Sequence, residues 1–153
     1  MSARVAGPVL ALSVVLCATG CAHHPVPASG TASSDVAGSA HPLIGVPWTW
    51  VRTVTQVEVI APSDPTDYTF ELGTDGRVSV RADCNRGSGA YTLDGPALHF
   101  GPMAMTLMAC PPGSLDGQFL KQLGGAAHTF WQGDTLMIDL VADSGTMRFV
   151  SAR

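Results

Sequence analysis

The stretch that decides the fold is YTFELGTDGRVSVRA, residues 68–82. Apolar and polar residues alternate on both sides of a central Gly-Thr-Asp-Gly segment, whose residue types favour a turn. Because successive side chains of a strand point to opposite faces, this period of two predicts a β-hairpin. The face predicted to be buried holds Tyr68, Phe70, Leu72, Val78, Val80 and Ala82. The face predicted to be exposed holds Arg77, Ser79 and Arg81.

Further short strands are predicted downstream of this hairpin. Leu98 and Phe100 follow the turn at Asp94-Gly95-Pro96, and two more turns separate later alternating segments. Those segments carry Phe130, Leu136, Ile138, Leu140, Met147 and Phe149. Several short strands at this spacing indicate a mostly β (α+β) domain, built as a small antiparallel curved sheet or barrel.

One helix is predicted to pack on that sheet. Leu115, Phe119 and Leu123 recur every four residues, with Leu120 beside them. Ser114 is the predicted helix cap, and the Gly124-Gly125 pair is predicted to end the helix.

The first twenty residues read as a signal peptide. Arg4 provides a positive charge ahead of the apolar run from Val5 to Ala18, which is shorter than the roughly 20 residues that a membrane span needs. The run ends in Ala18-Thr19-Gly20-Cys21, which resembles the lipobox of bacterial lipoproteins. That resemblance implies cleavage before Cys21 and attachment of a lipid to its thiol. Ordinary secretory cleavage at the same site is the alternative.

The segment from residue 21 to 41 is predicted to be a disordered tether behind the lipidated cysteine. It is rich in Ala, Ser, Gly and Pro and has no aromatic residue, so it cannot bury enough apolar surface to fold. Its histidines, His23, His24 and His41, have no further ligand at a workable spacing, and no metal site is predicted there. Residues 42–153 then form one domain.

The charge balance argues against a nucleic-acid partner. Without Arg4, seven Lys and Arg residues face 12 Asp and Glu residues, a formal charge of −5. Binding to phosphates needs clustered positive charge, and the one local concentration, around Arg77, Arg81 and Arg86, is interleaved with Asp75 and Asp83.

Cys84 and Cys110 are the two cysteines of the predicted domain, since Cys17 lies in the signal peptide. In an oxidising exported compartment, two cysteines in one small domain favour a disulfide. Cys84 follows the strand in phase with its buried face, so its sulfur is predicted to point inward. The next three residues, Asn85, Arg86 and Gly87, are predicted to form a turn in which the Asn85 side chain satisfies backbone groups.

A catalytic cysteine is the competing hypothesis. It requires a base, and His99 and His128 are the only histidines of the domain. The Gly87-Ser88-Gly89 segment lacks the spacing of a nucleophile elbow or a phosphate-binding loop. No catalytic residue, metal or cofactor is therefore predicted.

Two cysteine-centred segments resemble the META domain family, which includes the heat-inducible envelope protein HslJ. The first runs from Gly76 through Asp83-Cys84-Asn85-Arg86 to Gly89-Ala90-Tyr91, and the second is Thr106-Leu107-Met108-Ala109-Cys110-Pro111. The opening Leu43-Ile44-Gly45-Val46-Pro47-Trp48 fits the same family, so the resemblance covers roughly residues 43–150. Asp83 stands where many members have glycine. The motif residues carried over are Asn85, Arg86, Gly89, Tyr91, Thr106 and Met108.

The resemblance implies a small, mostly β domain without enzymatic activity. The sequence thus predicts a lipid-anchored protein of the cell envelope that acts by binding an unknown protein or small-molecule partner, with a role in stress or antibiotic tolerance. One alternative is a carrier whose hydrophobic cavity is lined by Met103, Met105, Leu107 and Met108. Another is an inhibitor of an extracytoplasmic hydrolase, acting through the loop at residues 61–67.

Overall fold

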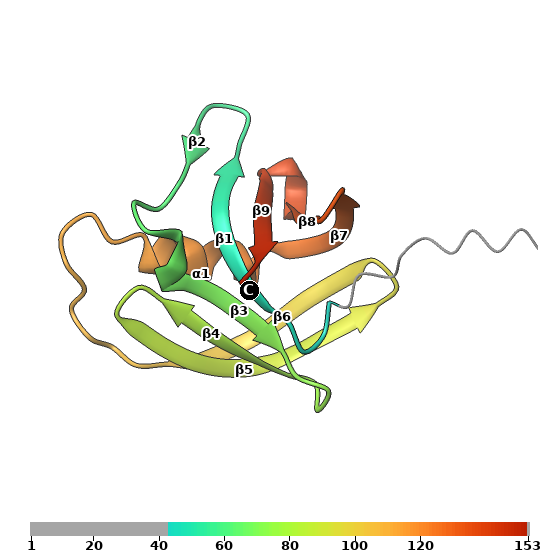
Figure 1. Cartoon of the computed structure of the whole chain (residues 1–153), viewed down its shortest axis with the longest axis horizontal. Coiled ribbons are helices and arrows are strands. Elements are labelled where there is room, and N and C mark those ends of the chain that lie inside the picture. Colours follow the sequence, from blue (N-terminus) through green and yellow to red (C-terminus); the bar gives the residue numbers. More distant parts are fainter. Residues whose placement is uncertain (1–42, 153) are drawn as a thin grey trace, which may run out of the picture. The chain divides into compact units, whose positions relative to one another are not determined.

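The computed structural model describes residues 43–152, so the predicted signal peptide, Cys21 and the tether lie outside the described residues. The strands are β1 (Pro47–Val54), β2 (Val59–Ile60), β3 (Tyr68–Leu72), β4 (Arg77–Ala82), β5 (Asn85–Asp94), β6 (Ala97–Met105), β7 (Ala126–Gln132), β8 (Thr135–Leu140) and β9 (Thr146–Ser151). The helix is α1 (Asp116–Gly124), and two short 3-10 turns are η1 (Pro65–Asp67) and η2 (Val141–Asp143). Figure 1 shows these elements.

The sheet closes on itself as an eight-stranded antiparallel barrel. Neighbouring strands follow the order β1-β3-β4-β5-β6-β7-β8-β9, and β9 pairs with β1 from Trp48↔Ser151 to Val54↔Thr146. The short β2 pairs with the far end of β1 and forms an arm outside the ring. Of the two predicted alternatives, the structure is therefore the barrel.

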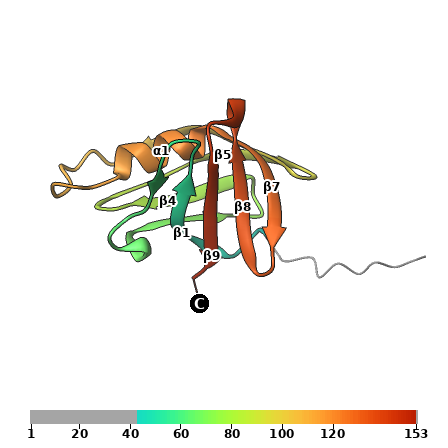
Figure 2. The same ribbon diagram turned by 90° about the horizontal axis from the view of Figure 1, so that it is seen from above.

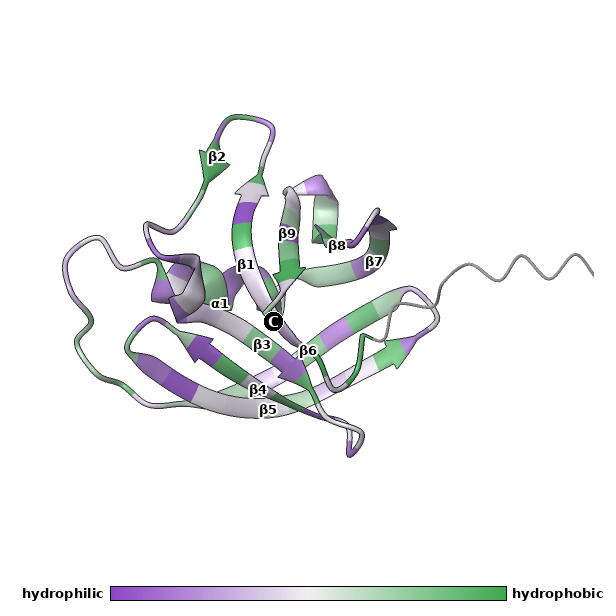
Figure 3. Ribbon diagram, in the orientation of Figure 1, coloured by the Kyte–Doolittle hydropathy of each residue, from purple (hydrophilic) through white to green (hydrophobic). Residues whose placement is uncertain are grey.

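The predicted hairpin is confirmed and forms β3 and β4. Phe70 lies opposite Val80, and Tyr68 lies opposite Ala82. All six residues predicted for the buried face are at most 4% exposed. Hydrophobic and hydrophilic residues alternate along these strands in Figure 3. Arg77 and Ser79 are exposed, whereas Arg81 is half-buried because its guanidinium forms an ion pair with Asp67.

Aromatic side chains fill the barrel interior. Phe119 of α1 stacks on Trp50 with ring centroids 5.2 Å apart, makes an edge contact with Tyr68 and lies at a tilt against Phe149. Trp50, Phe119 and Phe149 are fully buried. Figure 2 shows α1 lying across one end of the barrel, where Phe119 and Leu123 plug the opening.

The predicted helix is confirmed along its length, but the prediction of its N-cap is wrong. Leu115, not Ser114, occupies the N-cap position, and it provides no side-chain cap. The Ser114 hydroxyl instead accepts the N–H of Asp116, the first helical residue, at 3.2 Å. Gly124 ends the helix as expected.

Phe130 is the one apolar residue named in the predicted alternating segments that does not lie in the core. The register of β7 against β8 shifts between Ala126 and His128, and this bulge reverses the faces of the residues that follow. Phe130 is 42% exposed as a result, whereas Trp131 packs against the core.

Within residues 43–152, no helix has the length and apolar composition needed to cross a membrane.

Candidate functional site

The Cys84–Cys110 disulfide is confirmed, with the two Cα atoms 5.5 Å apart. The inward orientation predicted for Cys84 is wrong. Asp83 adopts a left-handed backbone conformation (φ 56°), so the alternation of β4 ends there and Cys84 lies half-buried in a tight turn. The disulfide therefore ties the β4–β5 turn to the segment after β6.

Asn85 is the centre of the polar contacts beside this disulfide. It opens β5 instead of lying in a turn, which corrects the prediction, and it is only 4% exposed. Its Oδ1 accepts the N–H of Met108 at 2.8 Å and the hydroxyl of Thr106 at 3.0 Å. Its Nδ2 donates to the carbonyl of Met108 at 3.2 Å and to Oδ2 of Asp116 at 3.1 Å. The predicted use of this side chain to satisfy backbone groups is thus correct, but the groups belong to a distant segment.

Thr106 holds the beginning of that segment against β5. Its N–H donates to the carbonyl of Arg86 at 2.9 Å, and its hydroxyl accepts the N–H of Arg86 at 3.0 Å. The hydrogen bonds of β5 and β6 thereby continue one residue beyond Met105. The backbone of residues 106–110 is fixed by the disulfide and by four motif residues, Asn85, Arg86, Thr106 and Met108. We call this segment the held loop.

The other two motif residues stabilise the barrel elsewhere. A side chain on Gly89 would place its Cβ 2.9 Å from the carbonyl of Pro102, so the close approach of β5 and β6 requires glycine. The Tyr91 hydroxyl donates to the carbonyl of Gly73 at 2.6 Å and secures the β3–β4 turn.

The side chains of the held loop point to solvent. Leu107 is 96% exposed and Met108 is 61% exposed, whereas Met103 and Met105 pack against the core. The four residues proposed for a carrier cavity therefore do not line a common space. Met103 and Met105 line a surface groove of about 340 Å³ beside Leu120 of the helix, and Leu107 and Met108 stand on the surface outside it.

The structure does not bring a base to Cys84. His99 lies opposite Thr92, and His128 lies opposite Ala97, near the closed end of the β5–β6 hairpin. Cys84 precedes the other end of β5 and lies eight residues before Thr92, which is about 26 Å at roughly 3.3 Å per strand residue. His99 instead places Nδ1 3.2 Å from the carbonyl of Ala126.

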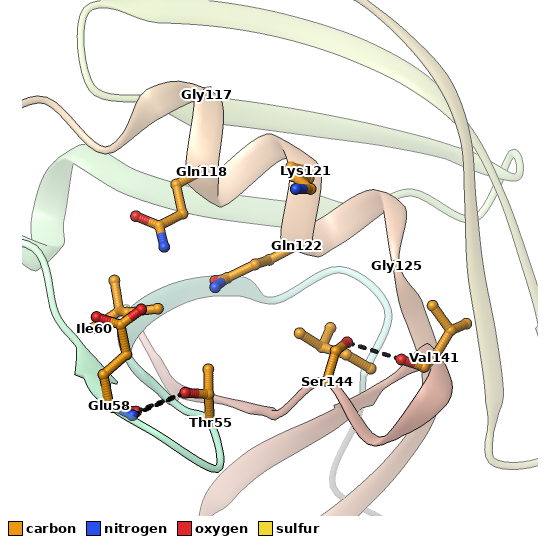
Figure 4. A pocket seen from close by; sticks show the side chains of 11 residues that line it. Thr55, Glu58, Ile60, Gly117, Gln118, Lys121, Gln122, Gly125, Val141 and Ser144 are labelled. Carbon is orange, nitrogen blue, oxygen red and sulfur yellow. Dashed lines mark hydrogen bonds between the residues drawn. The ribbon is translucent and has the colours of Figure 1, made fainter.

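A separate surface groove of about 560 Å³ lies between the β1–β2 arm, α1 and η2. Figure 4 shows Gln118 and Gln122 of the helix on one side and Glu58 and Ser144 on the other. The carboxamide oxygen of Gln122 already accepts the Thr53 hydroxyl at 2.7 Å, and Trp50 Nε1 donates to the same hydroxyl. Lining groups of this groove thus take part in the polar contacts that anchor α1.

The loop at residues 61–67, predicted as an inhibitory segment, is tied to the barrel. Its Asp67 pairs with Arg81, and the Asp67 carbonyl accepts the N–H of Asp83 at 2.8 Å. Hydrogen bonds from the hydroxyl and the N–H of Thr66 lower the pKa of the Asp64 carboxyl. No large apolar residue of this loop projects into solvent, so it is less suited to that role than the held loop.

The closed antiparallel barrel, its plugging helix and the disulfide-held loop define the class of domain. The family model of the META domain matches residues 41–153, and the chain belongs to this family. Among curated proteins, none matches the chain.

Two solved structures share the fold. A protein from Burkholderia xenovorans, solved by NMR, superposes with a TM-score of 0.61 at 24% identity, covering 72% of this chain and 83% of its own. A crystal structure of a DUF4847 family protein from Bacteroides vulgatus gives a TM-score of 0.53 at 12% identity, covering 74% of this chain and 96% of its own.

Proposed function

We propose that the chain is a lipid-anchored protein of the cell envelope that acts by binding a partner through the held loop, without catalysing a reaction. One observation carries this proposal: the motif residues fix the backbone of residues 106–110 while Leu107 and Met108 remain exposed. Exposed apolar side chains on a rigid frame suit binding, because little conformational entropy is lost when the partner docks.

A binding function is favoured over a catalytic one because the reactive groups of the domain are engaged in structural contacts. Both cysteines of the domain form the disulfide, and the side-chain amide of Asn85 takes part in five hydrogen bonds within the protein. A nucleophile needs an adjacent base, and neither domain histidine lies near the disulfide. The suggested role in stress or antibiotic tolerance rests on the family alone and is part of the proposal.

A hydrophobic carrier is the weaker alternative. The rings of Trp50, Phe70 and Phe119 are at most 1% exposed and contact other rings of the core. A ligand in the barrel interior would have to displace these side chains, at a cost comparable to that of opening a packed core.

Anchoring is tested by labelling with palmitate in a bacterial host. The wild-type chain should incorporate the label and partition into detergent, and Cys21→Ser should lose both properties because no other thiol occupies the lipobox position. Cys17→Ser is the matched control, since it removes a cysteine of the leader and should leave labelling unchanged. Release of unlabelled wild-type protein into the medium would show that the chain is secreted without an anchor.

A further inference from the structure

The held loop has one edge bound to the domain and one edge open. In extended backbone, the N–H and C=O of a residue point to the same side, and those of the next residue point to the opposite side. The amide of Asn85 takes both the N–H and the C=O of Met108, as a paired strand residue would. Met108 is therefore extended, with its main-chain polar groups turned toward the domain.

The backbone groups of Leu107 consequently face away from the domain. Within residues 43–152, the N–H and C=O of Leu107 have no hydrogen-bond partner. Its side chain is 96% exposed as well. Leu107 thus offers a free main-chain edge and an apolar side chain at the same point.

Both sides of the Leu107–Met108 peptide bond are held against the domain. Thr106, on the amino side, is held by the backbone of Arg86 and by Oδ1 of Asn85. On the carboxyl side, Met108 is held by Asn85, and Cys110 is held by the disulfide. If this peptide bond were cut, the two new ends would stay next to each other.

These features match what an endopeptidase recognises. Such an enzyme pairs with the main chain of an extended segment and takes one side chain into a specificity pocket. We propose that the held loop is a substrate-like inhibitory loop for an extracytoplasmic serine endopeptidase with an apolar specificity pocket, which would receive Leu107. This inference rests on the proposed function and names its partner.

The fixed ends explain why the loop would inhibit the enzyme instead of being consumed. When the serine hydroxyl attacks the carbonyl carbon of Leu107, an ester forms, the C–N bond breaks and the Met108 amine leaves with the proton that the enzyme delivers. Because Asn85 Oδ1 keeps that amine in place, the amine attacks the ester again. This step restores the peptide bond and returns the proton to the serine.

A membrane surface is the less favourable occupant of this loop. The mature chain carries a formal charge of −5. Asp64, Asp67 and Asp83 line a groove of about 420 Å³ that also includes Pro111 and Pro112, directly after the held loop. Carboxylates at this position oppose contact with anionic lipid headgroups.

The test is inhibition by the purified, processed chain in mild detergent against chymotrypsin, elastase and subtilisin, with trypsin as the enzyme of basic specificity. The wild-type chain should inhibit at least one of the first three with an inhibition constant below about 1 µM, in keeping with the tight binding typical of protease inhibitors. Leu107→Arg should weaken that inhibition at least about 30-fold, as loss of a central anchor does, and should create inhibition of trypsin.

Two further variants separate inhibition from general effects. Val57→Arg changes another exposed apolar residue, 89% exposed on the β1–β2 arm. It should alter neither the inhibition of the enzymes with apolar specificity nor the response of trypsin. Thr106→Val removes the hydroxyl that joins Arg86 to Asn85, and should speed cleavage between Leu107 and Met108, as followed by mass spectrometry.

Three results would overturn this inference: no inhibition of the panel, rapid cleavage of the wild-type chain at Leu107–Met108, or binding to anionic vesicles by Cys21→Ser that Leu107→Arg abolishes. A chain that takes up palmitate but inhibits none of these enzymes keeps its proposed anchoring and loses only this partner. A chain that inhibits one of these enzymes but never takes up palmitate keeps the proposed partner and loses the proposed lipid anchor.

Discussion

Phe119→Ala is expected to lower the free energy of unfolding by about 3–5 kcal/mol, the usual cost of removing a fully buried aromatic ring. Phe119 is the residue through which α1 plugs the barrel, and its ring contacts those of Trp50, Tyr68 and Phe149. Its loss would leave a cavity at the junction between helix and sheet. Because the neighbouring rings also pack on one another and on Phe70, little collapse can compensate for the cavity.

Denaturant unfolding followed by tryptophan fluorescence measures this effect, because Trp50 stacks on the mutated position. Phe130→Ala is the matched control: its ring is 42% exposed, and its loss should cost much less. Equal losses for the two variants would mean that α1 does not plug the barrel.

Removal of the Cys84–Cys110 disulfide is expected to cost about 2–5 kcal/mol. The cysteines are 26 residues apart in sequence, and the chain-entropy model gives roughly 3.5 kcal/mol for a loop of this length. Cys84→Ala, Cys110→Ala and the double variant should lose about the same amount, since each change breaks the same bond.

Unfolding in denaturant without reductant measures these three losses, and thiol titration of the unfolded wild-type domain gives the oxidation state. Without reductant, no free thiol should appear from Cys84 or Cys110. Two free thiols per domain, or losses in the single variants that add up in the double variant, would contradict a shared bond.

The hairpin of residues 68–82 was predictable because its information is local. A period of two interrupted by a Gly-containing turn fixes strand, face and register within fifteen residues of sequence, and Val78, Val80 and Ala82 are buried as that period requires. The body of α1 was predictable for the same reason, since Phe119 and Leu123 follow the helical period.

The strand alternation breaks at two places where a single residue changes the phase. Asp83 enters the left-handed region, which few residues other than glycine adopt, and Cys84 leaves the buried face as a result. The bulge between Ala126 and His128 turns Phe130 outward in the same way. A short pattern of apolar residues gives no sign of either irregularity.

The role of Asn85 was not predictable from local pattern because its partners are distant in sequence. Thr106 and Met108 lie 21 and 23 residues further along the chain. The sequence signal was the joint occurrence of Cys-Asn-Arg and Thr-Leu-Met-Ala-Cys, which marked both segments without showing that one holds the other. The antiparallel pairing of β5 with β6, in which Gly87 lies opposite Met105, places them side by side.

Amide hydrogen exchange of the held loop tests the central claim most directly, namely that Asn85 fixes its backbone and leaves Leu107 free. The Met108 amide should exchange at least about 100-fold more slowly than the Leu107 amide, because only the Met108 amide donates to the buried Asn85 side chain, at 2.8 Å. Asn85→Asp should remove most of this difference by placing a second carboxylate beside Asp116. Equally fast exchange of the Met108 and Leu107 amides in the wild-type protein would contradict a held loop.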